Sequence, residues 1–256
     1  MDLGNYYRHL ESIEREIVDR KLDTLVLGLG PTAWLLPWID RKLLVGMRIW
    51  GAHDIERIWP VDDLVIMDTP QHSPRLKPGT EALKFCVEAR PKRLWLYKRN
   101  AKAWRSLLHH AMRHVTTDVD YFVHQNPVLN PGEEHPRHFL LEWGRPHTGL
   151  VSPTGMTTLA WREGCRRIGV LGVEMDSDHR TCQWRKQVDG WFVDMARQAH
   201  EKGGAICNLS PISQLKLFRS WKPSASSSAP TNGSESQEPK KSSNTASENT
   251  ATAPSK

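Results

Sequence analysis

The chain lacks any long hydrophobic run and contains few cysteines. None of its apolar stretches approaches the length of about 18 residues that a membrane-spanning helix needs. The opening residues, MDLGNYYRHLESIERE, contain no apolar core of a secretion signal. The four cysteines are scattered without a C-x-x-C pair, so neither a zinc knuckle nor a disulfide framework is indicated. We therefore expect a cytoplasmic protein with reduced thiols and no membrane span.

Residues 223–256 lack aromatic and large aliphatic side chains altogether. The segment, PSASSSAPTNGSESQEPKKSSNTASENTATAPSK, carries three lysines and three glutamates, whose formal charges cancel. Such a composition cannot bury enough apolar surface to offset the entropy of ordering the chain. We predict one folded domain over residues 1–222, followed by a disordered Ser/Thr/Pro-rich tail at residues 223–256.

The folded part therefore carries the whole formal net charge of +6. A basic domain attracts nucleic acid when its charge gathers on one surface. Here Lys and Arg lie among acidic neighbours, and the densest basic cluster, RPKRLWLYKRNAKAWR at residues 90–105, flanks an expected strand. The pattern favours a solvated face over a surface for anionic substrates, and it argues against nucleic acid as a partner.

Apolar runs alternate with helix-period patterns along residues 1–222. Tyr6, Leu10, Ile13, Ile17 and Leu22 recur at roughly helical spacing, which predicts an amphipathic helix before the first strand. Strands are expected at residues 24–29, 43–49, 63–67, 93–97, 121–124, 168–173 and 205–208, and helices at 80–89, 103–114, 155–164 and 184–202. This alternation is typical of right-handed βαβ crossovers. The sequence thus predicts an α/β fold with a Rossmann-like, mostly parallel sheet flanked by helices.

The stretch TLVLGLGPT, residues 24–32, is an apolar run that ends in a glycine-rich turn. A buried parallel strand followed by such a turn lets a ligand approach the main-chain N–H groups. Gly28 and Gly30 form G-x-G, Pro31 and Thr32 follow, and Ala33 holds the third position of the dinucleotide pattern. The turn predicts a pocket for a nucleotide or a phosphate.

Polar residues also follow other expected strands. His53 and Asp54 come after the second strand, Asp68 after the third, and Gly172 and Glu174 after the sixth. Ligands of an open parallel sheet bind beyond the carboxyl ends of its strands, so these residues are expected to line the nucleotide pocket. For His53, Asp54 and Asp68, a role as ordinary turn formers is an equal alternative.

The segment VSPTG, residues 151–155, precedes an expected helix. Ser152 or Thr154 is placed to cap a helix that Gly155 opens, leaving N–H groups and the positive end of the helix dipole for an anion. The functional interpretation is phosphate binding at Ser152, Thr154 and Gly155. The alternative is that the two hydroxyls only cap a surface helix.

A short acidic segment with one histidine, MDSDH, follows Glu174. His179 is the best-placed general base, because an imidazole accepts a proton near neutral pH, and Asp176 and Asp178 accompany it as catalytic candidates. Asp176-Ser-Asp178 also matches the D-x-D pattern of metal-dependent glycosyltransferases, and carboxylates suit Mg²⁺ or Mn²⁺. Such short patterns arise often by chance, so a metal is not favoured, and a solvated loop histidine is the alternative for His179.

Several segments resemble a known superfamily. They are GLGPT at residues 28–32, TGMTTLAWREGCRRIGVLGVE at residues 154–174 and CNLSPISQL at residues 207–215. Together they look like the Rossmann-like fold of bacterial sialyltransferases, flagellin-glycosylating motility accessory factors and MptE-like pterin diphosphokinases, over about residues 24–218. Small bacteriophage proteins are similar as well, including HDIERIWPVDDLVIMD at residues 53–68, so the resemblance implies a phage or prophage origin and a host cytoplasm.

The resemblance implies a nucleotide or nucleotide-sugar donor as cofactor, with phosphates over residues 28–32 and residues 152–155 closing the other side. It implies a nucleotide-dependent transferase, most closely a glycosyltransferase, with an MptE-like diphosphokinase as an alternative. Leu29, Pro153 and Glu174 depart from the superfamily patterns, which often have Asn, an uninterrupted TSG and Asp there. These departures keep open a non-catalytic nucleotide-binding or assembly-related phage protein.

The composition of the tail leads to a first prediction. Deletion of residues 223–256 leaves the melting temperature of the folded domain unchanged, because the segment carries no apolar anchor. Thermal unfolding of the full chain and of the truncated chain, followed by circular dichroism, checks this. A large fall in melting temperature, or loss of solubility on truncation, contradicts it.

Overall fold

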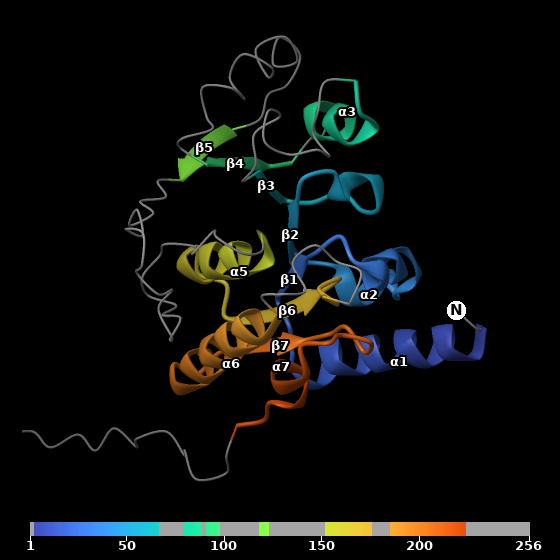
Figure 1. The fold of residues 1–256 in the computed structure, drawn as a ribbon, viewed down its shortest axis with the longest axis vertical. Coiled ribbons are helices and arrows are strands. Elements are labelled where there is room, and N and C mark those ends of the chain that lie inside the picture. The colour runs from blue at the N-terminus through green and yellow to red at the C-terminus, as the bar shows by residue number, and fades with distance from the viewer. Residues whose placement is uncertain are drawn as a thin grey trace, which may run out of the picture.

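The computed structural model describes residues 3–66, 79–88, 91–97, 118–122, 152–175 and 185–223. Within these residues, seven parallel strands form one sheet in the order β5-β4-β3-β2-β1-β6-β7 (Figure 1). The strands are β1 (Thr24–Leu27), β2 (Arg48–Ala52), β3 (Asp63–Ile66), β4 (Arg93–Tyr97), β5 (Asp118–Phe122), β6 (Arg167–Leu171) and β7 (Ala205–Asn208). The predicted α/β fold with a parallel sheet is confirmed.

Helices cover both faces of this sheet (Figure 1). They are α1 (Leu3–Asp19), η1 (Pro31–Trp38), α2 (Arg41–Leu44), η2 (Ile55–Arg57), α3 (Glu81–Glu88), α5 (Ser152–Arg162), α6 (Arg185–Glu201) and α7 (Lys216–Ser220), where η denotes a 3₁₀-helix. One core cluster lies between the sheet and α1, η1 and α2, and a second lies between the sheet and α5, α6 and α7. None of the described helices is long and apolar enough to cross a membrane.

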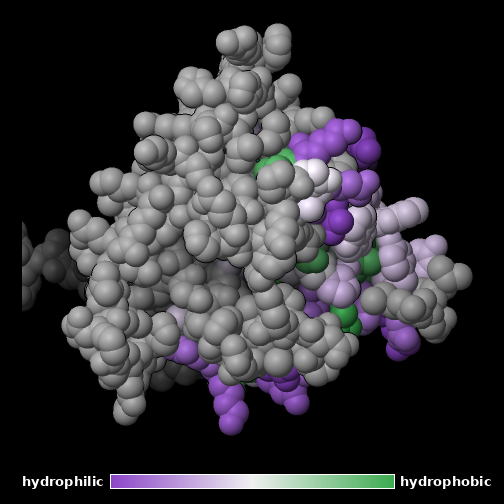
Figure 2. Space-filling model, turned by 45° about the horizontal axis from the view of Figure 1, so that its top comes forward, coloured by the Kyte–Doolittle hydropathy of each residue, from purple (hydrophilic) through white to green (hydrophobic). Residues whose placement is uncertain are grey.

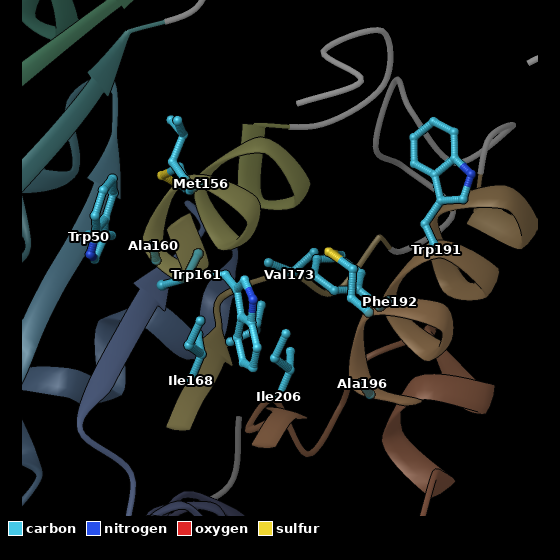
Figure 3. Close-up of a cluster of buried hydrophobic side chains, with 14 of the residues drawn as sticks. Trp50, Met156, Ala160, Trp161, Ile168, Val173, Trp191, Phe192, Ala196 and Ile206 are labelled. Carbon is cyan, nitrogen blue, oxygen red and sulfur yellow. The ribbon is translucent and has the colours of Figure 1, made fainter. Parts of the chain in front are cut away.

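The strands have apolar residues at successive positions because side chains on both faces of the sheet are buried. Leu25 and Leu27 belong to the first core cluster and Val26 belongs to the second, as the alternation of side chains along a strand requires. In the second cluster, Trp161, Trp191 and Phe192 pack around the α5 and α6 helices (Figure 3). Much of the tryptophan content therefore serves core packing.

Several element boundaries differ from the expected ones. The strand expected at residues 121–124 runs from Asp118 to Phe122, and those expected at 24–29 and 168–173 end at Leu27 and Leu171.

Two further differences have local reasons. The second strand was expected at residues 43–49 but runs from Arg48 to Ala52, because the Asp40 carboxylate accepts from the Lys42 N–H at 2.9 Å and starts α2. Helix α5 includes Ser152 and Pro153, three residues before the expected start, since proline is tolerated in a first helical turn. The helix expected at residues 103–114 lies outside the described residues.

The surface of the described part is mostly hydrophilic on the face drawn in Figure 2, with hydrophobic residues scattered among polar ones. The exposed large hydrophobic side chains of the described residues are Tyr7, Val18, Trp34, Trp38, Val45 and Leu217. Single exposed apolar residues are normal on a soluble domain.

The strand order creates one switch point. From β1 the chain moves to β2 on one side, whereas from β6 it moves to β7 on the other side, although β1 and β6 are neighbours. The chain therefore continues from β1 and from β6 toward opposite sides of the sheet. In open parallel sheets, ligands bind at such a switch point, beyond the carboxyl ends of the strands.

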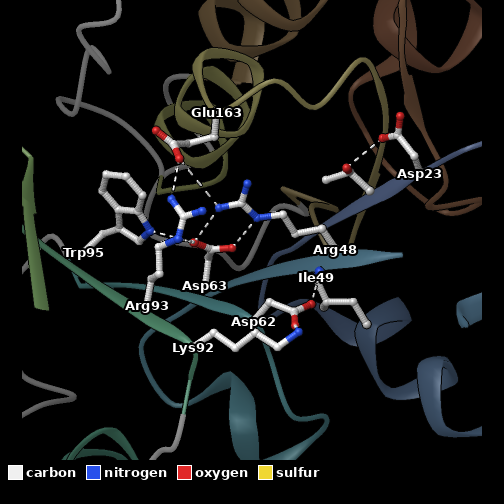
Figure 4. A network of polar contacts seen from close by, with 10 residues as sticks. Asp23, Arg48, Ile49, Asp62, Asp63, Lys92, Arg93, Trp95 and Glu163 are labelled. Carbon is white, nitrogen blue, oxygen red and sulfur yellow. Dashed lines mark hydrogen bonds and ion pairs between the residues drawn. The ribbon is translucent and has the colours of Figure 1, made fainter. Parts of the chain in front are cut away.

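The opposite, amino edge of the sheet is held by an ion-pair network around Asp63, the first residue of β3 (Figure 4). The buried Asp63 carboxylate accepts from Arg48 Nε at 2.6 Å and Nη2 at 2.9 Å, and from Trp95 Nε1 at 2.9 Å. Arg93 and Arg48 also pair with Glu163, at the end of α5. The network ties β2, β3, β4 and α5 together at the edge away from the switch point.

The Asp63 network leads to a second prediction. Asp63→Asn lowers the free energy of unfolding by about 2–4 kcal/mol, because it leaves Arg48 without its bidentate partner. The loss is smaller than for a fully buried pair, since the Arg48 side chain is 24% exposed. Urea unfolding measures the loss.

Asp62→Asn is the matched control. Its partner Lys92 is 82% exposed, and an asparagine oxygen can still accept from the Ile49 N–H, which Asp62 Oδ2 binds at 2.8 Å. The control costs less than about 1 kcal/mol. Equal losses in the two variants would show that the buried carboxylate does not anchor the amino edge.

Candidate functional site

Three loops meet at the carboxyl edge around the N–H of Gly172, which directly follows β6. This N–H donates to Thr32 Oγ1 at 3.1 Å and to Ser210 Oγ at 2.9 Å. The two hydroxyl oxygens lie 2.8 Å apart, and the Thr32 hydroxyl also donates to Glu174 Oε1. Hydrogen bonds thus join the loops after β1, β6 and β7 at the switch point.

Gly28 and Gly30 are required by the close approach of the β1 and β6 loops. A Cβ on Gly28 would lie 2.2 Å from the Gly172 carbonyl oxygen, and a Cβ on Gly30 would lie 1.6 Å from Glu174 Oε2. Their N–H groups donate to the carbonyls of Leu171 at 2.7 Å and Gly172 at 2.9 Å. The need for backbone approach was inferred correctly, but the group that approaches is the neighbouring loop.

Glu174 is a buried carboxyl group with only 4% of its surface exposed. Its Oε1 accepts from the Thr32 hydroxyl and from the Thr32 backbone N–H, whose nitrogen lies 3.4 Å from Oε1. Its Oε2 has no hydrogen-bond partner among the described residues. Burial raises the pKa of Glu174 above its usual range, against the opposing effect of the hydrogen bonds from Thr32 and Ser210.

The structure brings His53 and Ser152 together. His53 directly follows β2, and its Nε2 lies 3.4 Å from the hydroxyl oxygen of Ser152 in the first turn of α5. His53 has φ +52° and Met175 has φ +51°, a left-handed backbone that few non-glycine residues adopt. Such conformations occur at ligand sites, and these two lie beyond the carboxyl ends of strands, whereas Lys21, between α1 and β1, has φ +50° in an ordinary connection.

Other predicted residues have structural partners. Asp54 is 1% exposed and pairs with Arg57 Nε at 3.2 Å, and the Arg57 guanidinium lies 5.3 Å from the centre of the Trp34 ring. Thr154 is buried inside α5, where its carbonyl accepts from Thr158 Oγ1 at 3.0 Å, so the expectation that Thr154 caps the helix is wrong. Gly155 is buried within the helix. The expectation that Gly155 opens the helix is wrong, because the helix begins at Ser152.

Four predicted residues cannot be placed. Asp68, Asp176, Asp178 and His179 lie outside the described residues, so the catalytic assignments stay predictions. Among the residues that are described, no group of three or more His, Cys, Asp or Glu side chains is arranged to hold a metal ion.

The sequence analysis did not select the loop after β7 as part of the site. Ser210 binds Thr32 and Gly172, Ser213 Oγ donates to the Val173 carbonyl at 2.8 Å, and the Gln214 N–H donates to the Glu174 carbonyl at 2.8 Å. The signal was present in CNLSPISQL, whose small polar residues follow a strand. It was used for the resemblance alone, because no pattern shows which strands are neighbours.

Comparisons with known proteins give only a weak structural likeness. No family model and no curated protein matches the chain. Solved structures of the sialyltransferase CstII from Campylobacter jejuni are similar at a TM-score of 0.41. A variant of this α-2,3/8-sialyltransferase is 13% identical and covers 76% of this chain and 84% of its own, and a complex with a trisaccharide acceptor and CMP is 11% identical over 78% and 86%. A likeness this weak assigns no activity.

The burial of Glu174 leads to a third prediction. Since its pKa is raised in the folded state, the folded protein keeps a proton that the unfolded chain loses as pH rises. Stability therefore falls between the ordinary Glu value of about 4.3 and the folded pKa, by at most about 1.4 kcal/mol per pH unit. Glu174→Gln removes this fall, so its stability relative to the parent increases with pH across the window.

Urea unfolding of both proteins between acidic and neutral pH measures the difference. Glu201→Gln, at the exposed end of α6, is the control for loss of one carboxylate. A stability of Glu174→Gln relative to the parent that stays constant or falls as pH rises contradicts a raised pKa.

Proposed function

We propose that this protein is a nucleotide-dependent transferase that uses a nucleotide-activated donor, as a glycosyltransferase does, with its ligand at the carboxyl edge of the sheet. The observation that carries the proposal is the contact of His53 with Ser152 beside the β1–β6 switch point. It places an imidazole and a helix N-terminus at the edge where ligands of parallel sheets bind.

The start of α5 supplies the features that favour a phosphate. The first turn of a helix presents backbone N–H groups and the positive end of the helix dipole. Ser152 adds a hydroxyl, and His53 adds a ring nitrogen that can donate a hydrogen bond. The nucleoside would then extend along the carboxyl edge toward the loops after β1 and β6.

Transfer needs a base for the acceptor. In glycosyl transfer, an acceptor hydroxyl forms a bond to the anomeric carbon of the donor sugar, the bond from that carbon to the phosphate oxygen breaks, and the nucleotide leaves with the electron pair. A base takes the hydroxyl proton. We assign this role to His179, assisted by Asp176 or Asp178, because these residues directly follow Met175 in the sequence.

One observation favours a second candidate, a nucleotide-binding protein without catalysis. The N–H groups of Gly28 and Gly30 donate within the protein, which differs from a turn that cradles phosphate. Turnover decides between the two candidates. Nucleotide binding without hydrolysis or transfer of any donor supports the second.

The proposed site leads to a fourth prediction. At least one of CMP, UDP, GDP, ATP and their sugar conjugates, with or without Mg²⁺, raises the melting temperature of the full chain. Ser152→Ala weakens binding of that nucleotide by about 2–10-fold, the effect of one neutral hydrogen bond. His53→Asn removes the imidazole while asparagine tolerates the positive φ, and it weakens binding by a similar factor.

Isothermal titration calorimetry measures the affinities. Ser220→Ala, in the exposed helix α7, is the matched control for loss of a serine hydroxyl and binds like the parent. If no nucleotide raises the melting temperature, the transferase loses its basis. If both site variants bind with the affinity of the parent, the nucleotide lies elsewhere.

A further inference from the structure

We propose that Glu174 closes the glycine turn at residues 28–32 to phosphate, so that the ligand group that meets Glu174 beside the loops after β1 and β6 is an uncharged hydrogen-bonding group, such as a sugar hydroxyl. This inference rests on the proposed nucleotide site and decides which end of the nucleotide meets the turn. It revises the expectation, drawn from the sequence, that the phosphates lie over this turn.

The first reason is that several donors of the turn are already used. A phosphate-binding turn holds its anion through main-chain N–H groups that point at the ligand. Here the N–H groups of Gly28 and Gly30 donate to carbonyls of the β6 loop, and that of Ala33 donates to the Gly30 carbonyl at 3.0 Å. Pro31 has no N–H, and both the N–H and the hydroxyl of Thr32 are directed at Glu174.

The second reason is that the space is filled. The Glu174 carboxyl lies against the open side of Gly30, with Oε2 1.6 Å from the position a Cβ would take. The absence of a side chain at Gly30 therefore makes room for a carboxyl group of the protein. A phosphate would have to displace that group and break its hydrogen bonds to Thr32.

The third reason is the chemistry of the oxygen that remains. Glu174 Oε2 is buried and has no hydrogen-bond partner within the described part of the chain. A buried oxygen without a partner is costly: an ionised Glu174 needs a donor there, and a protonated Glu174 needs an acceptor. A sugar hydroxyl can donate or accept and carries no charge, whereas a phosphate carries negative charge that a buried carboxylate repels.

The test follows, by NMR, the chemical shifts of the backbone amide signals of Gly30 and Thr32 in the ¹⁵N-labelled full chain. Pyrophosphate leaves both signals unshifted in the parent. In Glu174→Ala it shifts them, because the change frees the Thr32 N–H and the space over Gly30. Glu174→Gln is the matched control, since glutamine fills the same volume and the turn stays closed. Glu174→Ser serves as the opened variant if Glu174→Ala does not fold.

Cytidine, uridine, guanosine and adenosine test the uncharged hydrogen-bonding group. At least one of these nucleosides shifts the amide signals of Gly30 and Thr32 in the parent. The affinity of the protein for that nucleoside falls about tenfold or more in the opened variant. Three results would each overturn the proposal. Pyrophosphate could shift the two amide signals in the parent, it could fail to shift them in the opened variant, or none of the nucleosides could shift them in the parent. The proposed function fails separately, if no nucleotide raises the melting temperature, while the pyrophosphate titration still decides whether the turn is closed.

Discussion

The structure depends on the junction at which the Gly172 N–H donates to the hydroxyls of Thr32 and Ser210. It fixes the loops after β1, β6 and β7 relative to one another at the point where the strand order diverges. Such a junction is possible only because Gly28 and Gly30 lack side chains, so that backbone and the Glu174 carboxyl can approach. The packing of the loops at the carboxyl edge follows from these contacts.

The two edges of the sheet differ in how their buried carboxyl groups are hydrogen-bonded. At the amino edge, Asp63 pairs with Arg48 and accepts from Trp95, and this bonding satisfies its charge within the protein. At the carboxyl edge, Glu174 Oε2 has no hydrogen-bond partner among the described residues. Satisfied charges are typical of a structural anchor, whereas unsatisfied buried groups are typical of a ligand site.

The sequence predicted the sheet and most of the loops that follow its carboxyl edge. The strands Arg93–Tyr97 and Ala205–Asn208 have their expected bounds, because their apolar central residues stand between polar or glycine-containing segments. The β2 boundary was missed because the cap at Asp40 forms a helical turn within an apolar run. Ser210 was missed, and Glu174 was assigned to the ligand alone, because the contacts between loops depend on strand order, which local patterns do not contain.

The most direct measurement is a crystal structure of the protein grown with the nucleotide that raises its melting temperature most. Electron density for the nucleotide at the carboxyl edge, touching His53 and Ser152, with the Gly30 N–H still bonded to Gly172, is the expected result. Density at the amino edge near Asp63, or away from the carboxyl ends of the strands, would contradict the assignment of the site.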